Sequence, residues 1–164
     1  MDKISKESKL EKLKKEYKKL QEKYKLPPFN ELNEDFSIEK AAENETDFVI
    51  REVRRQISEK AYNYLRFIET LINPVNAPMS IMTLVKTFGA EEKNKLTEIY
   101  KKLMKNELDL ISVDIEFSEK KEADFIKNTH KIWKEIKREF MEVVRSVEKN
   151  WNTKTENGSR KYFG

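Results

Sequence analysis

Residues 118–151, SEKKEADFIKNTHKIWKEIKREFMEVVRSVEKNW, decide the fold of this 164-residue chain. Apolar side chains recur in this segment at helical spacing: Ile126, Trp133, Ile136, Phe140, Val143, Val144, Val147 and Trp151. A helix with 3.6 residues per turn places these positions on one face over about nine turns. Both tryptophans and the only histidine, His130, lie here. The pattern predicts a long helix with one wide buried face, which other helices must cover.

The composition indicates an all-α protein. Charged residues make up 39% of the chain and hydrophobic residues 37%, whereas there are only 3 glycines and 4 prolines. Few helix breakers and long periodic runs are typical of helical proteins. We therefore predict an all-α helical bundle of four to five helices. Its two long helices, at about 37–72 and 118–151, are expected to pack nearly antiparallel, with helices at 80–88 and 90–111 completing the core.

Capping residues and breakers set the expected helix boundaries. Ser37 is a suitable N-cap for the second long helix, and Asn73-Pro74 stops it. Asn44 and Thr46 could divide this helix into a short and a long one.

Two further segments are expected to be connectors. Residues 29–36 should tuck against the body of the protein through their large apolar side chains. Residues 113–117 alternate apolar and polar side chains, but a single strand has no partner here, so we expect an extended connector. Between these segments, the helix at 90–111 carries a stripe predicted to face the core: Leu96, Ile99, Tyr100, Leu103, Met104, Leu108 and Ile111.

The N-terminal segment 3–25 predicts an amphipathic helix with a narrow apolar seam. The seam residues are spaced three and four apart: Leu10, Leu13, Tyr17, Leu20 and Tyr24. Lysines and glutamates occupy the rest of the surface, as in a short coiled coil. Such a helix needs a partner to be stable. The partner is either the body of the same chain or a second chain, and these five residues are our predicted partner-binding site.

Composition changes along the chain suggest three parts. Pro27-Pro28 ends the first helix, so residues 1–26 form an N-terminal amphipathic, coiled-coil-like helix. Residues 29–152 form the helical bundle domain. Residues 153–164 are rich in polar residues and are expected to form a C-terminal tail.

The sequence offers no recognisable catalytic constellation. There is no cysteine, which excludes thiolate nucleophiles, thiolate metal sites and disulfides, and three glycines are too few for a phosphate-binding loop. The residues three and four positions from His130 are Ile126, Lys127, Trp133 and Lys134. None is a carboxylate, so the histidine is interpreted as a packing residue. We predict no catalytic, cofactor-binding or metal-binding residue, no cofactor and no enzymatic activity.

Two carboxylate pairs resemble the spacing of magnesium ligands. Glu119 and Glu122 form one pair, and Glu139 and Glu142 form the other. The pairs lie twenty residues apart on one helix, or about 30 Å at 1.5 Å per residue, so they cannot share a metal ion within one chain. We expect these carboxylates to lie on a solvated face.

Nucleic-acid binding is the main alternative function. Basic residues cluster on the two long helices at Arg51, Arg54, Arg55, Lys131, Lys134 and Arg138. Clustered cations are what phosphate contacts require. Glutamates interrupt both clusters, and alternating charges are more typical of a solubilising helix surface.

These observations favour a non-enzymatic helical interaction or assembly protein. It would bind a partner helix or itself, through its first helix or through an exposed stripe of a long helix. No run of eighteen apolar residues and no apolar N-terminal leader is present, so we expect no membrane association and a cytoplasmic location.

Overall fold

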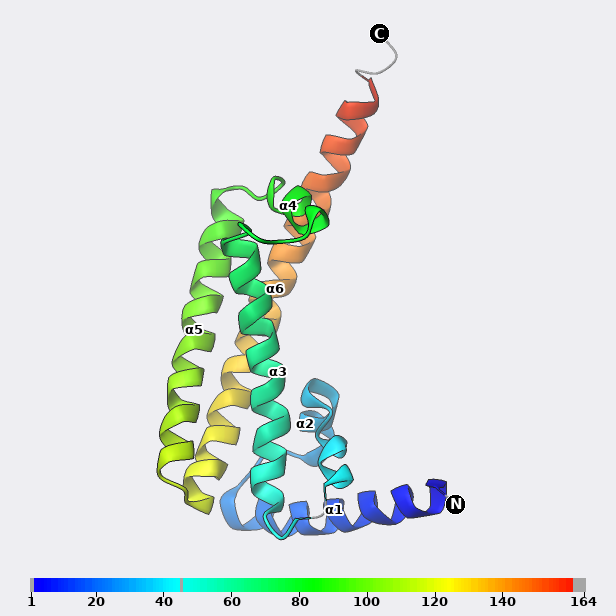
Figure 1. The fold of residues 1–164 in the computed structure, drawn as a ribbon, viewed down its shortest axis with the longest axis vertical. Helices are drawn as coiled ribbons and strands as arrows, with labels where there is room; N and C mark the ends of the chain where they lie inside the picture. Colours follow the sequence, from blue (N-terminus) through cyan, green and yellow to red (C-terminus); the bar gives the residue numbers. More distant parts are fainter. Residues whose placement is uncertain (1, 45, 161–164) are drawn as a thin grey trace. The chain divides into compact units, whose positions relative to one another are not determined.

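The computed structural model describes residues 2–44 and 46–160, and the side chains of residues 7–44 and 46–153 (Figure 1). The helices of this part are α1 (Asp2–Tyr24), α2 (Phe29–Phe36), the 3-10 helix η1 (Ile38–Glu43), α3 (Val49–Ile72), α4 (Met79–Val85), α5 (Ala90–Ile115) and α6 (Glu119–Arg160). The structure is 85% helical, and the described residues contain no strand. The prediction of an all-α fold is confirmed.

The chain forms two compact units. The first contains Met1–Asn63 and Lys105–Trp133, and the second contains Tyr64–Met104 and Lys134–Gly164. α3, α5 and α6 are continuous helices that contribute one part to each unit.

In the first unit, α1 packs on α2 and η1 (Figure 1). The ring of Tyr17 is buried edge-on against Phe29, with 5.5 Å between ring centroids, and its hydroxyl donates a 2.6 Å hydrogen bond to the Pro27 carbonyl. The αL conformation of Lys25 turns the chain after α1, and Pro27-Pro28 leads it into α2. The amphipathic first helix is therefore part of the core of its own chain.

The remaining core of the first unit lies between α2, η1 and the adjoining parts of α3 and α6. The ring of Phe36 contacts Trp133 at a centroid distance of 5.3 Å. Thr129 donates a buried 2.7 Å hydrogen bond to the side-chain oxygen of Asn106, which ties α6 to α5. Other fully or nearly fully buried apolar side chains are Leu32, Ile38, Ile50, Val53, Ile57, Ala123 and Ile126.

A buried ion pair lies at one end of this core. Arg54 of α3 donates from Nε to Glu122 of α6 at 2.7 Å and from Nη2 to Asp114 of α5 at 2.8 Å. The Glu122 side chain is 0% exposed. Three helices of the first unit are thus joined through one guanidinium group, whose planar donors suit two carboxylates at once.

In the second unit, the core consists of one stripe from each of three helices. The stripes are Leu65, Ile68 and Leu71 of α3, Leu96, Ile99 and Leu103 of α5, and Ile136, Val143 and Val147 of α6. The Phe140 ring contacts Tyr64 and Phe67 edge-on, at centroid distances of 6.1 and 6.3 Å. At the rim, Lys102 of α5 donates to Glu139 of α6 at 2.7 Å.

The first turn of α5 is fixed by a buried glutamate. Glu92 accepts a 2.8 Å hydrogen bond from the Gly89 backbone N–H and a second from the Ser146 hydroxyl of α6. A glutamate that bonds back to the residue three positions earlier is the second half of a capping box. These hydrogen bonds lower the pKa of the Glu92 carboxyl, with the Ser146 hydroxyl as the largest cause.

Several expected boundaries were wrong. Ser37 does not cap a long helix; its backbone is left-handed, and its N–H donates to the Asn33 carbonyl to end α2. Residues 29–36, expected to be a connector, are helical. The region 37–72 is not one continuous helix but is divided into η1 and α3, as the possible division at Asn44 and Thr46 predicted. α5 continues to Ile115 through the segment expected to be extended, and α6 continues past Trp151 to Arg160. Residues 161–164 of the expected polar tail lie outside the described residues.

Three burial expectations were also wrong. Val144 and Trp151 were expected on the buried face of the last long helix, but they are 40% and 43% exposed. Leu108 and Ile111 were expected to face the core but are exposed. Glu122 was expected on a solvated face but is buried, because Arg54 reaches it from α3. Its pair mate Glu119 is exposed and accepts from Lys23 and Tyr24 of α1.

The ion pair gives a stability prediction. Glu122→Ala leaves the Arg54 guanidinium buried with a partner removed, and we expect the free energy of unfolding to fall by about 3–5 kcal/mol. Urea denaturation followed by circular dichroism measures the loss. Glu119→Ala is the matched control, because it removes an exposed pair three positions away and should cost at most about 1 kcal/mol. Equal losses in the two variants would contradict the assignment.

The capping contact gives a second prediction. Glu92→Ala should lower the free energy of unfolding by about 1–2 kcal/mol, since the Gly89 N–H and the Ser146 hydroxyl both lose their acceptor. Glu91→Ala, at an exposed neighbouring glutamate, is the control. The folded-state pKa of Glu92 is depressed, so its contribution is present above the unfolded-state pKa of about 4.3 and is lost as pH falls through the folded value. The difference in the free energy of unfolding between wild type and Glu92→Ala should therefore become smaller in acid. A difference that becomes larger would contradict the proposed contribution of the Glu92 carboxylate.

Candidate interaction surface

An exposed apolar stripe runs along the part of α5 that belongs to the first unit. Leu108, Ile111 and Ile115 are 59%, 49% and 77% exposed. Their spacing of three and four places them on one helix face. Asn106 and Val113 are buried residues of the same stretch. At 100° per residue, Asn106 lies about 140° around the helix from Ile111, and Val113 lies about 140° from Leu108. Within the described residues of the first unit, this stretch of α5 thus has one side that is buried and one apolar side that is exposed.

Two exposed aromatic side chains lie near the end of α5. Phe117, two residues beyond Ile115, is exposed and meets the exposed ring of Phe48 edge-on at a centroid distance of 6.1 Å. The guanidinium of Arg51 lies 4.9 Å from the Phe117 ring centroid, within cation–π range. We refer to Leu108, Ile111 and Ile115 as the α5 stripe.

Charged residues flank the α5 stripe on both sides. One flank carries Lys105, Asp109 and Glu116, all exposed. The Glu116 backbone N–H donates to the Ser112 carbonyl, which closes the last turn of α5. Glu116 also accepts a hydrogen bond from Lys121, which lowers the pKa of its carboxyl.

The opposite flank carries Glu107 and Asp114. Burial raises the pKa of the Glu107 carboxyl, with the charge of Asp114 as the second cause. Asp114 is half exposed and is held by Arg54. The Arg54 guanidinium therefore offsets the negative charge of Asp114 on this flank.

The predicted seam of α1 lies largely against its own chain. Leu13 and Tyr17 are buried in the first unit, and burial raises the pKa of the Tyr17 hydroxyl above its ordinary value. Leu10, Leu20 and Tyr24 are partly buried. The Tyr24 hydroxyl donates to Glu119 at 2.6 Å. Of the two partners considered for this seam, the structure supplies the body of the same chain.

The predicted nucleic-acid-binding residues are divided between the two units. Arg54 is buried and bound by two carboxylates, and Arg51 lies 3.9 Å from Glu122. Arg55 is exposed, with Glu52 4.0 Å away, and Lys131 is exposed elsewhere in the first unit. The remaining two, Lys134 and Arg138, are exposed on the part of α6 that belongs to the second unit. Nucleic-acid binding by these residues stays a prediction.

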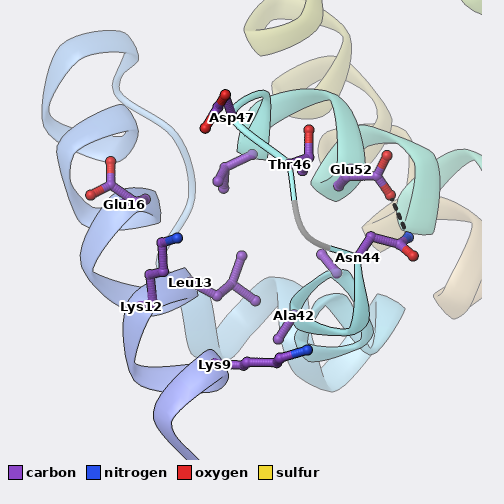
Figure 2. Close-up of a pocket in the computed structure, with 11 residues that line it drawn as sticks. Lys9, Lys12, Leu13, Glu16, Ala42, Asn44, Thr46, Asp47 and Glu52 are labelled. Atoms are coloured by element: carbon purple, nitrogen blue, oxygen red, sulfur yellow. Dashed lines mark hydrogen bonds between the residues drawn. The ribbon is translucent and has the colours of Figure 1, made fainter. Parts of the chain in front are cut away.

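A pocket of about 310 Å³ lies in the first unit between α1, η1 and the start of α3 (Figure 2). Figure 2 shows Lys9, Lys12 and Glu16 on one side and Asp47 and Glu52 on the other, around Leu13. Asn44 donates a 2.8 Å hydrogen bond to Glu52 at its edge. Both charge signs line this pocket, so it selects neither an anion nor a cation.

The histidine lies in the core of the first unit. His130 is buried, and its Nε2 is 3.7 Å from a carboxylate oxygen of Glu31. Within the part of the chain that the structure describes, no three acidic or histidine side chains are placed to hold a metal ion. In the same part, no helix is both long enough and apolar enough to cross a membrane.

Sequence reasoning missed the outward direction of the α5 stripe, although a signal was present. Residues 108–115, LDLISVDI, hold five large aliphatic side chains, more than one helix face can bury. A helix that is apolar around most of its circumference must be covered on more than one side.

Searches of protein-family models, curated proteins and solved structures gave no match to this chain.

Proposed function

We propose that this protein is a non-enzymatic helical interaction protein that binds a partner helix through the α5 stripe. The observation that carries the proposal is the exposure of Leu108, Ile111 and Ile115 at helical spacing on one face of α5. The proposed function is the one predicted from the sequence, but the proposed binding site is on α5. The predicted seam of α1 is largely buried against its own chain.

The energetics of apolar exposure support this assignment. Covering a fully exposed leucine or isoleucine side chain stabilises a complex by about 1.5–3 kcal/mol. Single exposed apolar residues are normal on a protein surface, but a row of them on one rigid helix is typical of a binding site. Anchors at positions i, i+3 and i+7 are the pattern by which two helices pack together.

The test is a single substitution in the middle of the α5 stripe. Tagged full-length wild type and Ile111→Asp are expressed in the cells from which the chain comes, recovered under gentle conditions and weighed by native mass spectrometry. Wild type should carry a partner chain, either another copy or a different protein, at fixed stoichiometry. Ile111→Asp should lose it, because a carboxylate at this position cannot be desolvated within an apolar contact.

The matched control is Val75→Asp, which places the same charge at an apolar residue as exposed as Ile115 but outside the α5 stripe. It should keep the partner. The free energy of unfolding of both variants should lie within about 0.5 kcal/mol of the wild-type value, since neither substitution changes a buried side chain. Recovery of wild type without any partner, or retention of the partner by Ile111→Asp, would refute the proposal.

A further inference from the structure

We infer that the outer face of α6 in the second unit binds the phosphate backbone of double-stranded nucleic acid. This face carries four exposed cations, Lys134, Arg138, Arg145 and Lys149, which we refer to as the α6 basic strip. The inference goes beyond the proposed function, because it concerns the other unit and a different class of partner.

The glutamates of this part of α6 lie away from the α6 basic strip. In the sequence, Glu135, Glu139 and Glu142 interrupt the basic residues, which is typical of a solubilising surface. In the structure, Nζ of Lys102 on α5 lies 2.7 Å from a carboxylate oxygen of Glu139 and 3.6 Å from one of Glu135. Nζ of Lys95, also on α5, lies 3.2 Å from Glu142. The three carboxylates therefore lie toward α5, where lysines offset their charge.

The α6 basic strip lies on the side of the helix opposite the core. At 100° per residue, the buried residues Ile136, Val143 and Val147 fall within about 40° of arc. The four cations fall within about 60° of arc, centred about 190° from the middle of the buried arc. No acidic residue between positions 134 and 149 falls within the basic arc. Glu142 lies about 20° beyond one edge, where it pairs with α5, and Glu148 lies about 40° beyond the other.

The four cations form a straight row along a rigid helix. At 1.5 Å per residue, Lys134 and Lys149 are about 22 Å apart along the axis. Within the described residues, Arg138, Arg145 and Lys149 make no ion pair with the chain. A row of cations attracts a linear polyanion and gains free energy by releasing the counterions condensed on it. The guanidinium groups of the two arginines also match pairs of phosphate oxygens.

The scarcity of apolar side chains on this face argues against a protein or membrane partner. Met141 lies about 20° beyond the edge of the basic arc, and the exposed residues Val144 and Trp151 lie at least about 80° beyond it. A protein partner requires apolar anchors at the centre of the contact, and a membrane requires an apolar face that inserts. Phosphate contacts require only the cations.

The absence of aromatic side chains from the α6 basic strip selects a duplex over a single strand. Proteins that bind single strands combine a basic surface with aromatic rings on which the bases stack. In a duplex the bases are already stacked, and the charge density reaches one phosphate per about 1.7 Å of axis. A face with cations alone fits the duplex.

The number of cations sets the expected affinity. Four phosphate contacts give a slope of about −3.6 for the logarithm of the binding constant against the logarithm of the salt concentration. The affinity should therefore fall roughly 100-fold between about 50 and 200 mM salt. The contacts read no bases, so we expect no sequence preference.

The first test measures this salt dependence with purified full-length protein and a fluorescent duplex of about 20 base pairs and mixed sequence. Fluorescence anisotropy should give the expected slope for wild type. Arg138→Gln with Arg145→Gln should reduce the slope to about −1.8 and weaken binding at low salt, because two phosphate contacts are lost.

The matched control is Lys93→Gln with Lys101→Gln, which removes the same charge from exposed positions on α5 in the same unit. It should keep the wild-type slope. Both double variants should keep the wild-type thermal midpoint by circular dichroism, since all four side chains are exposed. No binding by wild type at low salt, or equal losses in the two double variants, would overturn the inference.

The second test distinguishes the duplex from other polyanions. One strand of the same duplex, and vesicles of phosphatidylserine and phosphatidylcholine in a ratio of about 1:3, replace the duplex in parallel titrations. The duplex should bind most tightly. Tighter binding of the single strand would overturn the inference, and so would binding of vesicles without binding of the duplex, which would assign the strip to lipid head groups.

The third test locates the contact, and it uses the absence of cysteine from the chain. Met141→Cys, between the two arginines of the strip, and Lys101→Cys are each labelled with an environment-sensitive dye. The duplex should change the fluorescence at position 141 and leave position 101 unchanged. A response at position 101 alone would overturn the inference. Ile111→Asp, in the first unit, should bind the duplex as wild type does, so this inference and the proposed function can fail separately.

Discussion

The buried contact between Arg54 and Glu122 is the interaction on which the packing of the first unit depends in our account. A guanidinium and a carboxylate removed from water are each costly unless they meet, so α3 and α6 must hold the register that brings them together. Asp114 accepts from the same guanidinium and adds α5 to this register. Hydrophobic packing alone tolerates small sliding of helices, whereas a charge-assisted contact from three helices does not.

The same contact decides which side of α5 faces outward. With Asp114 held by Arg54 and Val113 buried, Leu108, Ile111 and Ile115 have no position in the core of the first unit. The exposed apolar side chains are thus a consequence of how α5 is anchored. Asn106, bonded to Thr129, fixes the helix about two turns earlier in the same orientation. A rigid helix with its apolar side chains preset loses little conformational entropy on binding, which favours a role as a docking surface.

The first helix shows that residue spacing can identify an apolar seam without identifying the surface that covers it. Its three-and-four spacing predicted a helix with a narrow apolar stripe, and the helix is present. The spacing could not distinguish a second chain from α2 and η1, because both offer apolar surface. The turn at Lys25 and Pro27-Pro28 returns the chain toward α1, where the Tyr17 hydroxyl finds the Pro27 carbonyl. Chain reversal places this partner at high local concentration, which a separate chain would have to match.

The sequence by itself determined the all-α class, the existence of the long helices and the residues able to form apolar stripes, because helical periodicity and the scarcity of glycine and proline act locally. Tertiary structure decided which stripes are covered. Leu103 and Leu108 look alike in the sequence, yet the first is buried and the second exposed. Likewise Glu119 and Glu122 form one spaced pair, but only Glu122 meets Arg54. Burial depends on which distant residues arrive at a given face, and spacing along one helix carries no information about them.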